Sequence, residues 1–257
     1  MASRGHRAPP VQQAFVLHHY DWSETSLVLD LFTREQGRMA VVAKGAKRPY
    51  SQLRAVLLPF QRIQVGLSKP VKGDGETPAD VVTLRGAEWV GGSTLPAGAA
   101  LFSGYYLNEL LLKFLARQDP HPTLFDAYAQ TLVRLDEMAL RAFELRLLAE
   151  VGLLPDLSVA TTTQLPLDPQ RLYALSPEAG VIVSAAGQEG LPAFSGAALV
   201  GLQAALLHGS MAALQQACES AQLQPLRQAL RGLLQYHLGH KPLRTRQVLL
   251  DVQKLME

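Results

Sequence analysis

The spacing of apolar residues changes along the chain near VGGSTLPAG, residues 90–98. Before this segment, β-branched or alternating apolar runs are short and separated by turn residues, which is typical of strands. After it, apolar residues recur every three or four positions, which is typical of helices. The chain is therefore predicted to be an α+β protein, with a β domain at residues 1–90 and a mainly helical domain at residues 91–257.

The β domain contains five predicted strands. They are QAFVLHHY (13–20), TSLVLDLFT (25–33), GRMAVVAKG (37–45), LLPFQRIQVGL (57–67) and DVVTLRGAEWV (80–90). Five short antiparallel strands with no long helical period fit a small barrel, and the OB-fold is the commonest five-stranded barrel. An SH3-like barrel would give much the same pattern.

The helical domain begins with three predicted helices, in AALFSGYYLNELLLKFLAR, TLFDAYAQTLVRLDE and MALRAFELRLLAEVG. Gly152 and Pro155 close the third helix. Residues 155–194 are predicted to contain a small β-hairpin, RLYALSPEAGVIVS, with its turn at Pro177 to Gly180. Ser195 is a predicted N-cap for the helices that follow.

Composition excludes several classes of protein. Charged or amide side chains interrupt every apolar run before it reaches the length of a membrane span, and MASRGHRAPPVQQ has no apolar signal core. The single cysteine, Cys218, excludes an internal disulfide and a cysteine-rich zinc cluster, and its helical context predicts a packed structural thiol. We therefore expect a cytoplasmic protein without membrane contact.

Charge is unevenly distributed, although the net charge is only +2. Residues 36–73 contain eight cations and no acid, and residues 220–250 again contain cations without acids. Residues 120–200 hold four cations and nine acids. Two basic zones separated by an acidic one indicate a polyanionic ligand. The cations of the second zone are Arg227, Arg231, Lys241, Arg244 and Arg246.

The strongest candidate site lies in the first basic zone, in VVAKGAKRPYSQLRA at residues 41–55. Glycine, proline and serine let backbone amides approach a phosphate, and neighbouring aromatic rings can stack on unpaired bases. A solvated loop is the alternative, but a loop charged for solubility normally mixes both signs. The candidate DNA-binding residues are Arg38, Lys44, Lys47, Arg48, Tyr50, Arg54 and Phe60.

Other candidate sites are weaker. The common nucleotide-binding, hydrolase and metalloprotease motifs are absent from the sequence, so it predicts no catalytic residue, and His18 and His19 point to opposite faces of a strand. The acids Asp21, Glu24 and Asp30 read as turn and strand-surface residues. Arg141, Phe143 and Arg146, by contrast, combine cations with an aromatic ring in one helix and are a candidate site for a short acidic, aromatic peptide.

Several of these segments together resemble the RecO family of bacterial recombination mediators. The resemblance rests on the aromatic-aliphatic first strand, Glu24 with Ser26, the LFT...GR segment (31–38), the AKGA.R loop and LLPF (57–60). YYLNELL (105–111), FELRLLAEVG (143–152) and LGHKPLRTR (238–246) extend it to nearly the whole chain.

The resemblance implies an OB-fold followed by a helical domain, and a DNA-binding protein without catalytic turnover or cofactor. It implies binding to single- and double-stranded DNA, annealing of complementary strands, and action with RecR to help RecA displace single-strand-binding protein. It also implies that the helical domain recognises the acidic, phenylalanine-ended tail of single-strand-binding protein, and that the protein works at the bacterial nucleoid.

The chain departs from many RecO proteins at one point. These carry a four-cysteine zinc module where this sequence has TTTQLPLDPQRLYALSPEAGVIVS and no cysteine. The chain resembles the metal-free branch of the family, with the hairpin of residues 155–194 in place of the module, and we expect no zinc.

Two other functions remain open from the sequence. A protein-interaction adaptor would use the basic barrel to grip an acidic partner surface, and an enzyme would need an unrecognised site. The second basic zone (Arg231, Lys241, Arg244 and Arg246) either extends the DNA track or binds the acidic tail.

Overall fold

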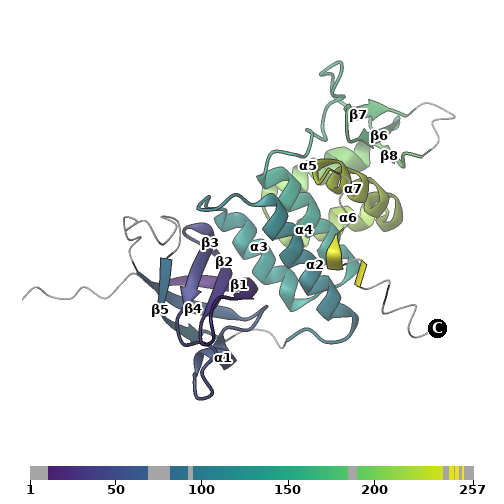
Figure 1. Cartoon of the computed structure of the whole chain (residues 1–257). Helices are drawn as coiled ribbons and strands as arrows, with labels where there is room; N and C mark the ends of the chain where they lie inside the picture. The colour runs from purple at the N-terminus through teal and green to yellow at the C-terminus, as the bar shows by residue number, and fades with distance from the viewer. Residues whose placement is uncertain are drawn as a thin grey trace, which may run out of the picture. The chain divides into compact units, whose positions relative to one another are not determined.

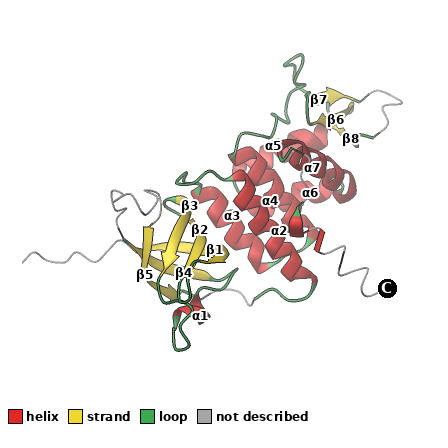
Figure 2. Ribbon diagram, in the orientation of Figure 1, coloured by secondary structure: helices red, strands yellow, loops and turns green. Residues whose placement is uncertain are grey.

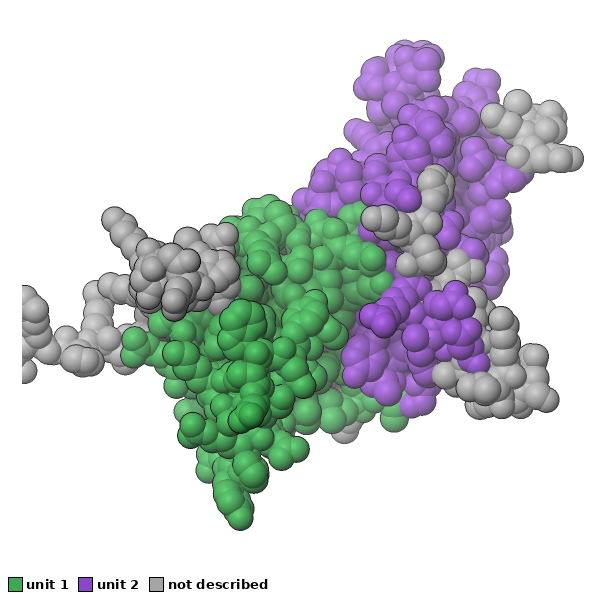
Figure 3. Space-filling model, viewed as in Figure 1, with its two compact units in different colours: residues 1–97, 108–129 green, residues 98–107, 130–257 purple. Residues whose placement is uncertain are grey.

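The computed structural model of the chain describes residues 11–68, 82–91, 95–184, 190–239, 243–245, 247–248 and 251. The chain forms two compact units, shown in different colours in Figure 3. Unit 1 comprises residues 1–97 and 108–129, and unit 2 comprises residues 98–107 and 130–257. Unit 1 therefore takes residues from both sides of the boundary expected near residue 90, whereas unit 2 lies entirely after it.

Five strands of unit 1 close into a barrel (Figures 1 and 2). They are β1 (Val11–Asp21), β2 (Leu27–Thr33), β3 (Gly37–Ala43), β4 (Arg62–Leu67) and β5 (Val82–Trp89), hydrogen-bonded in the order β1-β2-β3-β5-β4. β1 also pairs with β4, which closes the barrel. The expected α+β class and OB-like barrel are confirmed. The expectation of purely antiparallel pairing is wrong, because β3 and β5 run parallel.

Side-chain alternation builds the interior of the barrel. Along β3, Met39, Val41 and Ala43 point inward and are buried, whereas Lys44, just beyond the strand, is exposed. β1, β2 and β4 contribute Val16, Leu29, Leu31, Ile63 and Val65 to the same cluster. The core is thus one cluster of mainly aliphatic side chains inside the barrel.

The predicted strand at residues 57–67 is too long. Helix α1 (Leu53–Val56) precedes it, and β4 begins only at Arg62. Leu57 and Phe60 lie in the turn between α1 and β4, and both are buried; Phe60 has a φ of 68°. Pro59 lacks a backbone donor for a ladder. The LLPF run is therefore apolar because its turn buries Leu57 in the barrel core and also buries Phe60, rather than because it is a strand.

An aromatic cluster explains why residues 108–129 belong with the barrel. Phe15 of β1 lies 5.1 Å from Phe125 and 4.9 Å from Tyr128, both on helix α3 (Pro122–Val133), measured between ring centroids. Asn108 of helix α2 (Ala99–Phe114) donates to the Leu17 carbonyl at 3.0 Å and accepts from the Tyr128 hydroxyl at 2.5 Å. Burial raises the pKa of Tyr128, so its hydroxyl stays a donor.

Unit 2 is organised around helix α4 (Glu137–Glu150). Helices α5 (Gly196–His208), α6 (Met211–Ser220) and α7 (Leu223–His237) pack against α4. Most of α4 is buried, including Phe143 and Leu147. Asp136 caps its start by accepting from the Ala139 amide. A helix surrounded in this way shows little amphipathic pattern, since nearly every side meets another element.

A small sheet completes unit 2. The predicted hairpin is confirmed as β6 (Leu172–Ser176) and β7 (Gly180–Val183), with Ser176 opposite Gly180 at the turn. A short strand that was not anticipated, β8 (Ala193–Ser195), pairs with the other edge of β6. Ser195 then caps α5 as predicted, because its hydroxyl accepts from the Ala198 amide. Among the helices that the structure describes, none is long and apolar enough to cross a membrane.

Candidate nucleic-acid interface

Arg38 is not positioned as a DNA contact. Its guanidinium lies 3.0 Å from the buried carboxylate of Asp30 and donates to the Leu112 carbonyl at 2.6 Å, at the end of α2. Only 17% of the Arg38 side chain is exposed. A cation is favourable at a helix C-terminus, where carbonyl groups point outward without partners. Arg38 therefore joins β2, β3 and α2 inside unit 1, and the expectation that it meets a phosphate is not supported.

The turn that precedes Arg38 is structural as well. The Thr33 hydroxyl donates to the Gly37 carbonyl at 2.9 Å and accepts from the Gln36 amide at 3.1 Å. Gly37 has a φ of 69°, and a β-carbon on it would lie 1.8 Å from the Asp119 carbonyl oxygen. The LFT...GR segment thus fixes the turn against the chain that follows α2.

The cations of residues 44–54, called here the basic loop, have a different environment. Lys44, Arg48 and Arg54 are exposed, and none forms an ion pair with another residue that the structure describes. Tyr50 is 99% exposed. Figure 1 shows α1, where the basic loop ends, at one end of the barrel. Three positive charges and an aromatic ring therefore face solvent together on one loop.

Two anchors hold the shape of the basic loop. Ala46 is fully buried in the barrel core. Tight turns follow, in which the Arg48 amide donates to the Gly45 carbonyl at 3.1 Å and the Ser51 amide donates to the Arg48 carbonyl at 3.0 Å. Gly45 has a φ of 73°, a conformation that glycine adopts without strain. The loop is therefore presented on a fixed base.

Lys47 connects the basic loop to the turn at residues 22–26. Its amide donates to the Thr25 carbonyl at 2.9 Å, and its ammonium group donates to the Ser23 carbonyl at 3.1 Å. The ammonium group also lies 3.1 Å from the exposed Asp21 carboxylate. An exposed pair of this kind contributes little and is easily exchanged for another anion. Lys47 thus holds the basic loop to this turn, and its charge is still accessible to another anion.

Of the two aromatic candidates for DNA contact, Tyr50 is exposed and Phe60 is buried. Phe60 is only 5% exposed, so its ring belongs to the core and is not available for stacking. The sequence reasoning missed two exposed rings, Tyr20 at 50% and Trp22 at 64%, beside the basic loop. The available signal was a tryptophan in DWSET, a turn between two strands, where an aromatic ring has no core to enter.

The second basic zone is described only in part. Arg231 on α7 and Arg244 are exposed, whereas Lys241 and Arg246 lie outside the described residues. The zone therefore stays a prediction.

Arg141 and Phe143 lie in the interior of unit 2. Phe143 is fully buried. Arg141 lies 2.6 Å from the buried Glu144 carboxylate, which also accepts from the Tyr106 hydroxyl at 2.6 Å. Burial raises the pKa of Glu144 and that of Tyr106. Neither Arg141 nor Phe143 can meet a peptide at the surface in this conformation, because α4 is enclosed by its neighbouring helices.

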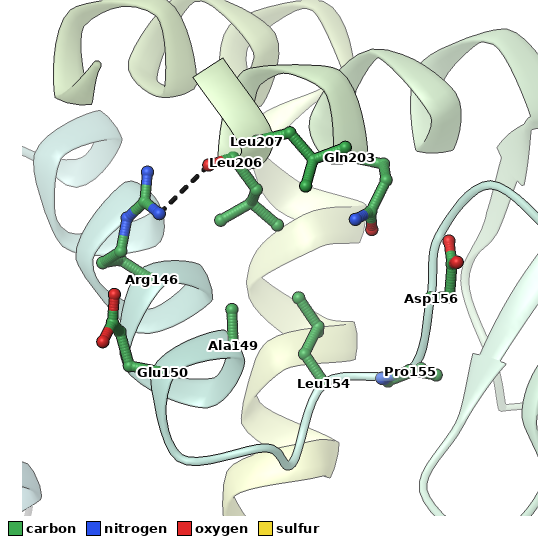
Figure 4. Close-up of a pocket in the computed structure, with 9 residues that line it drawn as sticks. All are labelled: Arg146, Ala149, Glu150, Leu154, Pro155, Asp156, Gln203, Leu206 and Leu207. Carbon is green, nitrogen blue, oxygen red and sulfur yellow. Dashed lines mark hydrogen bonds between the residues drawn. The ribbon is translucent and has the colours of Figure 1, made fainter. Parts of the chain in front are cut away.

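Arg146 differs from its two companions because it lines a pocket. The pocket, drawn in Figure 4, has a volume of about 520 Å³. Arg146 donates to the Leu206 carbonyl at 3.1 Å, while its Nε and Nη2 atoms have no hydrogen-bond partner among the described residues. Leu154, Leu206 and Leu207 supply apolar walls, and Glu150 and Asp156 also line it. A guanidinium with two unused nitrogen donors beside leucines suits a single carboxylate next to an apolar group.

Known proteins match the chain along almost its whole length. Family models match residues 11–76 to "Recombination protein O N terminal" and residues 96–247 to "Recombination protein O C terminal". The DNA repair protein RecO of Polaromonas sp. strain JS666 is 47% identical over 252 residues, covering 95% of this chain and 97% of the relative. The DNA repair protein RecO of Variovorax paradoxus strain S110 is 49% identical, with coverages of 95% and 96%. The chain therefore belongs to the RecO family.

Proposed function

We propose that the protein is a DNA-binding and strand-annealing mediator of repair and recombination at the bacterial nucleoid. It acts with RecR to load RecA on single-stranded DNA covered by single-strand-binding protein, and it performs no catalytic step itself. The observation that carries this proposal is the basic loop, with three exposed cations that lack counter-ions among the described residues. The names of the relatives, DNA repair protein RecO, support the same conclusion.

The chemistry of the basic loop suits a phosphate backbone. The ammonium group of Lys44 and the planar guanidinium groups of Arg48 and Arg54 can donate to phosphate oxygens. Lys47 adds a charge close by, and Tyr50 offers a ring to an unpaired base. Phosphate contacts carry no sequence information. DNA binding is therefore expected to be independent of sequence, as annealing of arbitrary strands requires.

Replacing Arg48 and Arg54 by glutamate tests the site. The double variant is expected to bind a fluorescently labelled single-stranded oligonucleotide of arbitrary sequence more weakly, because two phosphate contacts and the counter-ions that they release are lost. The salt dependence of log K should become shallower by about 0.7 per lost contact on a single strand. Fluorescence anisotropy over a salt titration measures both quantities.

Arg171→Glu is the matched control, since Arg171 is an exposed arginine of unit 2 outside both basic zones. It should leave the salt slope unchanged. Equal binding by the Arg48→Glu/Arg54→Glu variant and the unaltered protein would exclude the basic loop as the DNA site. An adaptor for acidic proteins would instead bind naked DNA weakly and without dependence on its length. Purified protein should hydrolyse neither ATP nor DNA.

For the acidic tail of single-strand-binding protein, we infer that the Arg146 pocket is the docking site. Arg146 would receive the terminal carboxylate, and the walls formed by Leu154, Leu206 and Leu207 would receive the phenylalanine ring. Because Glu150 and Asp156 share the pocket, the remaining acids of the tail must lie outside it.

A fluorescent peptide ending in acidic residues and phenylalanine tests the pocket. Leu207→Asp changes an exposed wall residue without removing a core residue, and it should strongly weaken binding because it replaces an apolar contact of the ring with a charge that repels the acidic peptide. The same peptide with an amidated C-terminus should bind at least tenfold more weakly, because the charge-assisted hydrogen bond to Arg146 is lost. If both changes leave affinity intact, the tail binds elsewhere.

A further inference from the structure

We propose that Trp22, assisted by Tyr20, is a stacking surface for unpaired bases and gives the barrel a preference for single strands over duplex. This inference rests on the proposed DNA-binding function and names the residues that sense the strandedness of the ligand. Trp22 lies in the turn between β1 and β2, and 64% of it is exposed. An exposed indole next to cations is the combination that stacking on unpaired bases uses.

The turn that carries Trp22 is held in a defined shape. The Trp22 amide donates to the Ser26 carbonyl at 3.1 Å, and the Ser26 amide donates to the Ser23 hydroxyl at 3.2 Å. Ser26 itself is buried. A fixed turn presents the indole ring at little cost in conformational entropy, which is the property of a preorganised binding surface.

Lys47 brings this turn next to the phosphate-binding cations. It contacts the carbonyls of Ser23 and Thr25 and the carboxylate of Asp21, so residues on both sides of Trp22 are joined to the basic loop. Asp21 and Glu24 flank the indole and repel phosphate. The turn therefore offers its ring to a base, and the basic loop offers its charges to the backbone of the same strand.

Tyr20 extends the surface along β1. Its ring packs edge-on against His18 at 4.5 Å between centroids, and half of Tyr20 remains exposed. Val28 and Val42, opposite Tyr20 across β2 and β3, are half-buried. One part of the outer face of β1, β2 and β3, from Tyr20 through Val28 and Val42 to Lys44, is thus at least partly exposed. Bases in a duplex are already stacked and cannot use such a face, whereas unpaired bases can.

Intrinsic fluorescence offers a direct test, because the chain has two tryptophans. In Trp89→Phe protein, Trp22 is the only indole, and its emission should be quenched when it stacks on a thymidylate oligomer of about 16 nucleotides, the upper site size of an OB-fold. A blunt duplex of the same length should not quench it. Trp89 is the matched control: it is 60% exposed, but lies on β5, which pairs with β3 and β4 rather than with β1 or β2.

Affinity should change in parallel. Trp22→Ala is expected to weaken binding of the single strand by about tenfold and to leave duplex binding within twofold, while Trp22→Phe retains most of the affinity because a ring remains. Trp89→Ala should leave both affinities unchanged.

The outcomes separate the inference from the function on which it rests. If Arg48→Glu/Arg54→Glu weakens DNA binding but Trp22→Ala does not, or if Trp22 emission responds equally to duplex, the stacking surface is wrong and the DNA-binding site stands. If the charge variant also binds normally, the proposed function of the loop fails as well.

Discussion

Asp30 is buried and lies 3.0 Å from the guanidinium of Arg38, so the charge of Arg38 already has its partner. Arg48 lies in the same acid-free segment of the sequence, but it has no such partner among the described residues. Both arginines look alike in a count of charges. What distinguishes them is a carboxylate eight positions earlier in the sequence, on the neighbouring strand, together with the carbonyls at the end of α2. Individual cations of a basic segment therefore differ in role according to what the fold places beside them.

Replacing Arg38 by glutamine should destabilise the fold rather than weaken DNA binding directly. The substitution leaves the Asp30 carboxylate buried without a counter-charge, which typically costs about 3 kcal/mol or more. Denaturant unfolding measures the loss, and a second change, Asp30→Asn, should recover part of it by removing the orphaned charge.

Arg34→Gln is the control for this prediction. Arg34 also binds a carboxylate, that of Asp126, in a bidentate pair at 2.9 and 3.0 Å, but both side chains are 42% exposed. Exposed pairs contribute about 1 kcal/mol or less. Equal losses for the two arginine variants would contradict the structural role assigned to Arg38.

At the scale of single elements, the sequence predicts those whose evidence is local. The hairpin β6–β7 and the Ser195 cap were predictable because turn residues and a capping hydroxyl act on their immediate neighbours. The parallel pairing of β3 with β5 was not, since it depends on how the barrel closes. The LLPF run was assigned to a strand because a buried turn has no period that separates it from a short strand.

In the candidate site, too, the features with local evidence were predictable and those that depend on the fold were not. Exposed loop cations were identifiable from a segment without acids, because charge needs no folding to be recognised. Phe60 and Phe143 were misjudged, since only the fold determines whether a ring faces solvent or core. Arg146 was singled out without its pocket, because one wall of the pocket is made by residues of α5 that are distant from Arg146 in sequence.

At the scale of the whole molecule, the change of period at residues 90–98 marks only one of the edges of the compact units, the end of the first segment of unit 1 at residue 97. Residues 108–129 are helical, yet they belong with the barrel in unit 1. The cause is the packing of Phe125 and Tyr128 against Phe15 and Phe32 on the outside of the barrel. These helical residues add buried aromatic surface to the aliphatic surface that the barrel buries inside itself.

Hydrogen exchange on the full-length chain tests whether these helical residues and the barrel share their stability. Phe125→Ala removes a fully buried ring and should cost about 3–5 kcal/mol. The loss should appear as faster exchange of the backbone amides of β1, β2 and β3, because the outer face they share loses its cover. Leu214→Ala, a buried position of α6, is the counterpart in unit 2 and should accelerate exchange in α4, α5 and α6 instead. If Phe125→Ala leaves the barrel amides protected while unit 2 loosens, then residues 108–129 derive their stability from the helices, and the unit boundary follows the change of period after all.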